Sequence, residues 1–274
     1  MSADFPALEQ YLAHLCAEPK AHARVWADHG GRALGRFFQS TLASAFQSIR
    51  EPGGQWVAYE AFTRSHAEGD GGLSVWRLLD HAASDDESVE LDRLCRMLHA
   101  INFFRQPASA GHDVYMSVHA RLLAAVDGNH GTAFRRVLSA LGVPQKRVVL
   151  QLPAIGAHQA WLLAYVADNY RRNGFRIALN AADPQDALQL VQRLRPEVVK
   201  LDVRDGVDDA AVLHLLEVCG SAGTRLIFKR VQTPQGLDVV RRIAAVSLQP
   251  VLMQGFLFDM PNGELGTARF QAAA

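Results

Sequence analysis

Charged side chains that could hold a ligand stand within short apolar segments of this sequence. Glu60, Lys200, Asp202 and Lys229 each lie within or at the end of a run typical of a buried strand. Lys200 and Asp202 are two residues apart, so in a strand they point to the same face and could form a structural ion pair. The sequence contains no H-E-x-x-H, G-x-S-x-G or glycine-rich phosphate-loop motif that would indicate another chemistry.

The segments that must position these residues alternate in a β/α pattern from about residue 112 to 257. Apolar runs that do not alternate with polar residues indicate parallel strands covered by helices. The expected strands are 114–118, 147–152, 175–179, 198–201, 225–229 and 250–255. The expected helices between them are 129–141, 157–173, 184–194, 207–222 and 234–245. Gly174 and Gly223 stand where helix ends favour a left-handed residue.

Two earlier strands, 45–49 and 56–62, are predicted to form a hairpin around the turn-like segment 51–54. One strand of the hairpin must then run against the others. The whole pattern predicts an α/β protein with a TIM-like (β/α)8 barrel that contains one antiparallel strand. Helices at 73–83 and 86–105 are expected between the hairpin and the third strand.

The segment before the barrel carries apolar residues at helical spacing, among them Leu8, Leu12 and Leu15. We therefore divide the chain into an N-terminal helical extension (1–43), a barrel domain (44–261) and a C-terminal tail (262–274). The chain after Phe258 is expected to be loosely ordered.

The composition limits the possible partners and locations. The chain has 28 basic and 28 acidic residues, and this balance gives no reason to expect binding to a nucleic-acid polymer or to an anionic membrane. Its three cysteines are odd in number and lack metal-ligand spacing, which favours a reducing compartment. Neither a secretory signal nor a run of about 18 apolar residues occurs, so we expect a cytoplasmic protein.

Eight short segments, one for each expected barrel strand, resemble the strands of the EAL family of cyclic di-GMP phosphodiesterases in the same order. Phe46–Ile49 is similar to the opening F/Y-Q-P-I strand, and Tyr59–Arg64 to the signature E-A-L-x-R. The other six segments are Met116–His119, Leu150–Ala154, Ile177–Ala182, Val199–Asp202, Phe228–Thr233 and Gln254–Phe258. The resemblance covers about residues 44 to 261.

The resemblance implies hydrolysis of one phosphodiester bond by a water held on magnesium or manganese, which carboxylates would bind. Most of the family's ligand positions carry other residues here, namely Ser117, Gln151, Ala154, Asn180, Ala181, Lys229 and Gln232. Glu60, Lys200, Asp202 and Gln254 are retained. At least four negative charges are lost and one positive charge is gained, so we expect no metal cofactor, no catalytic residue and no enzyme activity.

The candidate ligand-binding residues that remain are Gln47, Glu60, Arg64, Lys200, Asp202, Lys229 and Gln254. Arg64 could clamp a phosphate or pair with a neighbouring acid, and Gln47 could contact a guanine edge. Lys229 could hold phosphate, although an ion pair with Glu60 is favoured because an unpaired buried carboxylate is costly. His119 could replace a metal ligand, although a packed histidine is the simpler interpretation.

These patterns predict a degenerate EAL-like signalling regulator that acts through an unidentified protein partner. The first alternative is a cyclic di-GMP receptor that needs no metal, and the second is a residual phosphodiesterase. Three arginine clusters, at 171–172, 193–195 and 241–242, are expected to be solvated helix faces.

Overall fold

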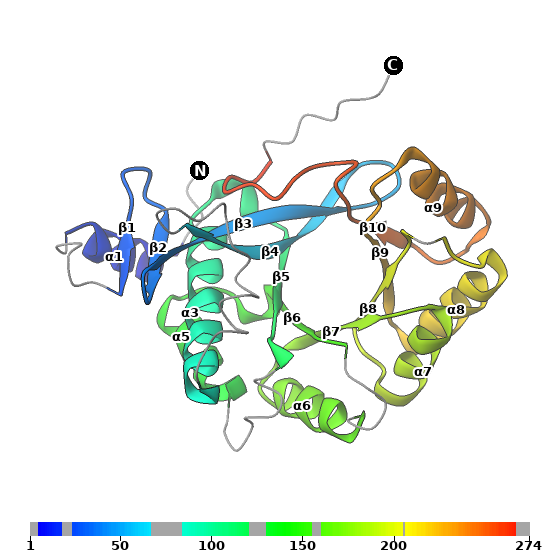
Figure 1. Cartoon of the computed structure of the whole chain (residues 1–274), viewed down its shortest axis with the longest axis horizontal. Coiled ribbons are helices and arrows are strands. Elements are labelled where there is room, and N and C mark those ends of the chain that lie inside the picture. Colours follow the sequence, from blue (N-terminus) through cyan, green and yellow to red (C-terminus); the bar gives the residue numbers. More distant parts are fainter. Residues whose placement is uncertain are drawn as a thin grey trace.

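The computed structural model describes residues 5–17, 24–66, 84–120, 130–154, 160–204 and 206–266. Within these residues the strands form one sheet in the order β1-β2-β3-β10-β9-β8-β7-β6-β5-β4, and pairing of β3 with β4 closes strands β3 to β10 into a barrel (Figure 1). β3 runs antiparallel to both β4 and β10, and the other barrel neighbours are parallel. The predicted α/β barrel with one antiparallel strand is confirmed.

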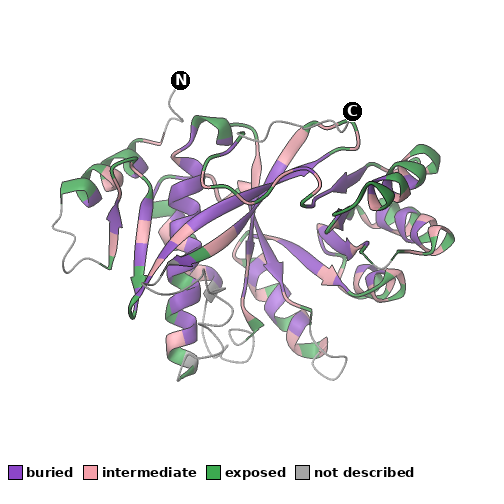
Figure 2. Cartoon of the chain, turned by 45° about the horizontal axis from the view of Figure 1, so that its top comes forward, coloured by how far each residue is buried: buried purple, intermediate pink, exposed green. Residues whose placement is uncertain are grey.

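The eight barrel strands lie close to the predicted ranges and are largely buried (Figure 2), whereas the two strands before them were not predicted. The strands are β1 (Val25–Ala27), β2 (Ala33–Phe37), β3 (Ser40–Arg50), β4 (Trp56–His66), β5 (Asp113–Ser117), β6 (Val148–Leu152), β7 (Arg176–Ala181), β8 (Val198–Asp202), β9 (Arg225–Lys229) and β10 (Val251–Met253). β3 and β4 are longer than expected because their pairing continues from Arg50 opposite Trp56 to Thr41 opposite His66.

Helices surround the barrel as the β/α pattern predicted (Figure 1). They are α3 (Asp85–Phe104), α5 (His130–Ala140), α6 (Ala160–Arg172), α7 (Pro184–Leu194), α8 (Asp209–Ala222) and α9 (Pro234–Val246), with 3₁₀ turns η1 (Pro107–Ser109) and η2 (Gln145–Arg147). Helix α1 (Pro6–Ala17) lies outside this ring, beside β1. Gly174 and Gly223 have φ angles of 83° and 70°, as expected for helix-ending glycines. The helix predicted at 73–83 lies outside the described residues, and no described helix is both long and apolar enough to cross a membrane.

The N-terminal segment is not wholly helical, and that expectation was wrong. Only α1 is a helix there, and β1 and β2 extend the sheet from the projecting part of β3. Residues 33–37 alternate between buried and more exposed side chains, which is the period of a strand, and Gly31 (φ 70°) turns the chain between β1 and β2. The predicted boundary at 43/44 therefore falls inside β3.

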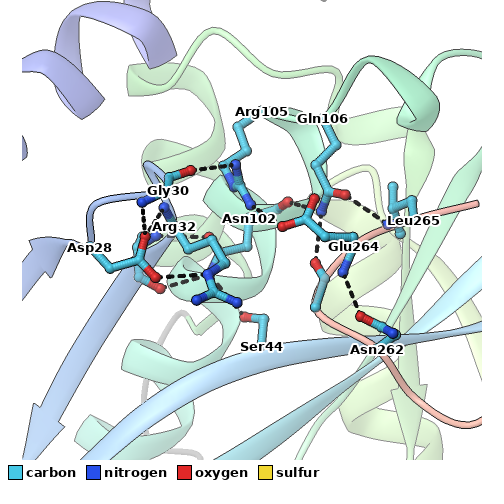
Figure 3. A network of polar contacts seen from close by, with 12 residues as sticks. Asp28, Gly30, Arg32, Ser44, Asn102, Arg105, Gln106, Asn262, Glu264 and Leu265 are labelled. Carbon is cyan, nitrogen blue, oxygen red and sulfur yellow. Dashed lines mark hydrogen bonds and ion pairs between the residues drawn. The ribbon is translucent and has the colours of Figure 1, made fainter. Parts of the chain in front are cut away.

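A polar network ties this N-terminal sheet to α3 and to the C-terminal segment (Figure 3). Asn102 on α3 exchanges two hydrogen bonds with the backbone of Ala33, at 2.8 and 2.7 Å. Gln106 donates to the carbonyl of Gly263 and accepts from the amide of Leu265 at 2.8 Å. Loose order after Phe258 is thus wrong for residues 259–266, because these bonds and the buried Leu265 side chain fix them.

Candidate functional site

The barrel interior is built in layers, and the candidate residues form one of them. The lower layer is apolar and takes one residue from each barrel strand: Ile49, Ala58, Tyr115, Val149, Ala178, Val198, Ile227 and Leu252. Side chains in a strand return to the same face every second residue. Two positions further toward the cavity, the same strands, with the end of β10, carry Gln47, Glu60, Ser117, Gln151, Asn180, Lys200, Lys229 and Gln254. All eight line a single cavity at the C-terminal ends of the parallel strands, where barrel active sites lie.

Lys200 stands at the centre of this polar layer and is 1% exposed. Its Nζ donates three hydrogen bonds, and the acceptors are Glu60 Oε2 at 2.6 Å, Gln151 Oε1 at 2.9 Å and Gln254 Oε1 at 2.9 Å. An ammonium group has three donors, so each of them has a partner. The ion pair with Glu60 also neutralises the buried positive charge.

Glu60 is enclosed by donors on both carboxylate oxygens. Besides Lys200, it accepts from Gln151 Nε2 at 2.8 Å on Oε1 and from Gln254 Nε2 at 2.7 Å on Oε2. Burial alone would raise the pKa of Glu60, but the ammonium of Lys200 and the two amide donors outweigh it and hold the pKa below its ordinary value. Glu60 is therefore a buried, ionised and fully partnered carboxylate.

These contacts do not fit a divalent cation. A magnesium or manganese ion requires several oxygen ligands, and both Glu60 oxygens are instead covered by N–H groups and by an ammonium. The amide oxygens of Gln151 and Gln254 are also directed at Lys200. Among the described residues, no group of three or more His, Cys, Asp and Glu side chains is placed to hold a metal ion.

Lys229 does not pair with Glu60, contrary to the sequence-based expectation. Its Nζ donates to Asn180 Oδ1 at 2.7 Å, and Asn180 in turn donates to the carbonyl of Leu152. Lys200 is the lysine that forms the ion pair with Glu60, at 2.6 Å. Burial, with the like charges of Lys200 and Arg230, lowers the pKa of Lys229 to about 8.

The expected pair between Lys200 and Asp202 is also wrong. Asp202 binds two arginines instead, with Oδ2 3.0 Å from Arg204 Nη2 and 2.8 Å from Arg230 Nη1. Burial acts to raise the pKa of Asp202, but hydrogen bonds from both arginines keep it below its usual value. Lys200 and Asp202 share a strand face, but Glu60 across the barrel is the carboxylate that Lys200 reaches.

Gln47 and Arg64, the residues expected to contact nucleotide, are bonded within the chain. Gln47 is 3% exposed, donates to the carbonyl of Asp259 at 2.8 Å and accepts from Gln254 at 3.0 Å. Arg64 donates to the carbonyl of Pro261. The guanine contact of Gln47 stays a prediction, and among the described residues no acid forms an ion pair with Arg64.

The remaining predicted positions differ in their surroundings. Ala154, Gln232 and His119 line the cavity, whereas Ala181 is buried in the apolar layer outside the barrel. The backbone of His119 donates to Asp92 Oδ1 at 3.2 Å. Asp92 is the ion-pair partner of the buried Arg96 on α3.

The cavity has a volume of about 650 Å³ and includes residues that the sequence analysis did not select. Arg204 and Arg230 stand at its mouth, and Cys95 and His99 of α3 form one wall. Burial raises the pKa of the Cys95 thiol to about 12, so it is no thiolate nucleophile at neutral pH. For the two arginines, the one sequence feature that could have indicated a place at the cavity is that Arg230 directly follows a predicted strand. Nothing in the sequence indicates that α3 forms a wall of the cavity.

The sequence profile of the EAL domain matches residues 32–261, which is most of the chain and includes β2 and every strand of the barrel. The chain belongs to the EAL domain family. No curated protein matches it in sequence.

Solved structures share the EAL fold at low sequence identity. The manganese and cyclic di-GMP complex of BlrP1 from Klebsiella pneumoniae is 21% identical over 81% of this chain and 56% of that chain, with a TM-score of 0.66. The EAL protein YkuI of Bacillus subtilis, in complex with cyclic di-GMP and calcium, is 17% identical over 83% and 56%, with a TM-score of 0.68. The EAL domain of FimX from Xanthomonas citri, in complex with cyclic di-GMP, is 18% identical over 81% and 88%, with a TM-score of 0.65. This EAL chain thus spans little more than half the length of the first two structures.

Proposed function

We propose that this EAL-domain chain is a non-catalytic regulator that binds a ligand in its barrel cavity and does not hydrolyse it. The observation that carries the proposal is that Glu60 is the one carboxylate among the eight polar-layer residues, and that the Lys200 ammonium and the amides of Gln151 and Gln254 cover both of its oxygens. A catalytic metal would have to take this carboxylate from Lys200, and it would meet Gln151, Asn180 and Lys229 where the family resemblance implies acids. Neither condition favours a dication in a buried site.

Cyclic di-GMP is the first candidate ligand. The BlrP1, YkuI and FimX structures each contain this dinucleotide, and this chain shares their fold. The cavity is of ligand size, and the cations Lys229, Arg204 and Arg230 line it. A metal-free receptor for an anionic dinucleotide needs such charges.

A protein partner is the second candidate, and a specific observation supports it. The amide of Gln47 and the guanidinium of Arg64 are already bonded to the C-terminal segment. Calorimetric titration with cyclic di-GMP in the presence of chelator separates the two. Heat of binding supports a cyclic di-GMP receptor. If high ligand concentration produces neither heat nor thermal stabilisation, the receptor is excluded and a protein partner is the remaining candidate.

Manganese binding tests the non-catalytic proposal itself. We expect electron paramagnetic resonance to show no specific Mn²⁺ site in the wild-type protein at millimolar metal. The matched variant Gln151→Glu/Asn180→Asp/Ala181→Asp/Lys229→Glu puts back the acidic residues that the family resemblance implies and is expected to gain affinity. A wild-type Mn²⁺ site that is lost on replacing Gln151 by Leu would contradict the proposal.

A further inference from the structure

We propose that Lys229, Arg230 and Arg204 form an oxyanion site at the cavity mouth that binds a phosphate or phosphodiester group directly, without a metal. This inference rests on the proposed function, because it requires a cavity that binds without hydrolysis. It assigns the ligand contact to cations, two of which, Lys229 and Arg230, stand where the EAL resemblance has a glutamate and a glycine. The ligand class is an anionic phosphate ester.

Among the described residues at the mouth, positive charges outnumber negative ones. Lys229, Arg204 and Arg230 carry positive charge, and Asp202, which both arginines share, carries one negative charge. Glu60 offsets nothing further, because it is paired with Lys200 at 2.6 Å. Within the described part of the chain, Lys229 has no acidic partner within ion-pair distance. Its hydrogen-bond acceptor is the neutral Asn180.

Donors remain available for a ligand at two of the three cations. Lys229 uses one of its three N–H donors, on Asn180, and Arg230 uses one of its five, on Asp202. Lys229 and Arg230 are adjacent residues at the end of β9, and both side chains line the cavity. Phosphate oxygens accept several hydrogen bonds at once, and a guanidinium matches two of them with paired N–H groups.

The backbone at Arg230 decides which substitution tests its side chain. Its φ angle is 62°, in the left-handed region that favours glycine, and the EAL resemblance has glycine at this position. Arg230→Gly therefore removes the guanidinium without straining the backbone.

The test compares wild type with Arg230→Gly and Lys229→Met in buffer with chelator. Calorimetric titrations use inorganic phosphate in one arm and cyclic di-GMP in the other. We expect wild type to bind at least one of them, and each substitution to weaken that binding roughly tenfold, the effect of one charge-assisted contact. Binding of inorganic phosphate indicates a general phosphate site, and binding of the dinucleotide alone indicates a phosphodiester site. Both results support the proposal.

Folding does not obscure this experiment. Arg230→Gly relieves backbone strain and Lys229→Met removes a partly buried cation, so both variants should keep or raise the thermal midpoint. Lys146→Met and Arg241→Ala each remove one exposed positive charge away from the cavity and should leave affinity unchanged. No binding in either arm, or equal losses in the control variants, would overturn the site. The chelator keeps this outcome separate from the hydrolysis question, which is decided in metal-containing buffer.

Discussion

At the residue scale, Lys200 is the side chain on which the whole site depends. It lies two positions beyond the apolar Val198 on the same strand face, so the strand itself directs it into the barrel. A buried ammonium is stable only with a counter-charge and acceptors for its protons. Glu60 supplies the counter-charge and one acceptor, and Gln151 and Gln254 supply the other two acceptors.

We predict that removing either charge of this pair alone is severely destabilising. Glu60→Gln leaves Lys200 buried without a carboxylate, and Lys200→Met leaves Glu60 without a cation, so each should lower the free energy of unfolding by about 3 kcal/mol or more. The loss of unfolding free energy in the double variant should be about 2 kcal/mol smaller than the sum of the losses in the two single variants. Urea unfolding of the four proteins gives the coupling, with the exposed Glu51→Gln as control. Additive losses would contradict a direct buried pair.

The family resemblance made these positions predictable, but not the pairs that they form. All eight polar-layer residues were named from segments that resemble the EAL family, and the strand period of two places them in one layer. Whether Lys200 or Lys229 pairs with Glu60 depends on which ammonium comes within ion-pair distance of the carboxylate. The distances across the barrel decide this, and the order of the strands in the sequence does not give those distances.

At the element scale, His99 fastens α3 to the two hairpin strands of the barrel, β3 and β4. The ring bonds Ser44 Oγ on β3 at 2.9 Å and Thr63 Oγ1 on β4 at 3.1 Å. Burial lowers the pKa of His99 to about 3, so it is neutral in the folded protein at all ordinary pH values. Two hydroxyl partners and a neutral imidazole hold the helix on the strands without a buried charge.

This contact predicts a pH dependence of stability. Below the ordinary histidine pKa of 6.5 the unfolded chain protonates His99, whereas the folded protein does not until about pH 3. The unfolded state then binds more protons, so stability is lost as pH falls. Between pH 6.5 and 5, wild type should lose about 2 kcal/mol more than His99→Gln. Urea titrations at the two pH values measure this, with exposed His29→Gln as control. Equal losses in wild type and His99→Gln would refute the assignment.

The N-terminal elements show where sequence reasoning failed and why. Residues 25–37 form short strands that pair with the projecting part of β3, and that projection was not expected because the hairpin was predicted too short. A strand of three residues has too little pattern to reveal itself, and its partner decides its structure. The β/α units from 112 to 257 were predictable because each carries a complete strand and helix signal.

At the scale of the whole molecule, the EAL barrel is retained while its interior is organised around an internal ion pair. The closed sheet, the antiparallel β3 and the cavity at the strand ends follow the family fold. The differences from the family pattern lie in the polar layer and at the cavity mouth, where amides, Lys229 and Arg230 occupy positions that the resemblance gives to acids or glycine. A scaffold kept with altered chemistry is consistent with regulation by binding.

Hydrolysis of cyclic di-GMP tests this account most directly. Purified protein at a concentration equal to that of the dinucleotide is incubated with magnesium or manganese, and linear product is separated chromatographically. We predict no product above that of a parallel sample with chelator. The account would be contradicted by product that the chelator abolishes, provided that the activity co-purifies with the protein over two different chromatographic steps and falls in Gln151→Leu.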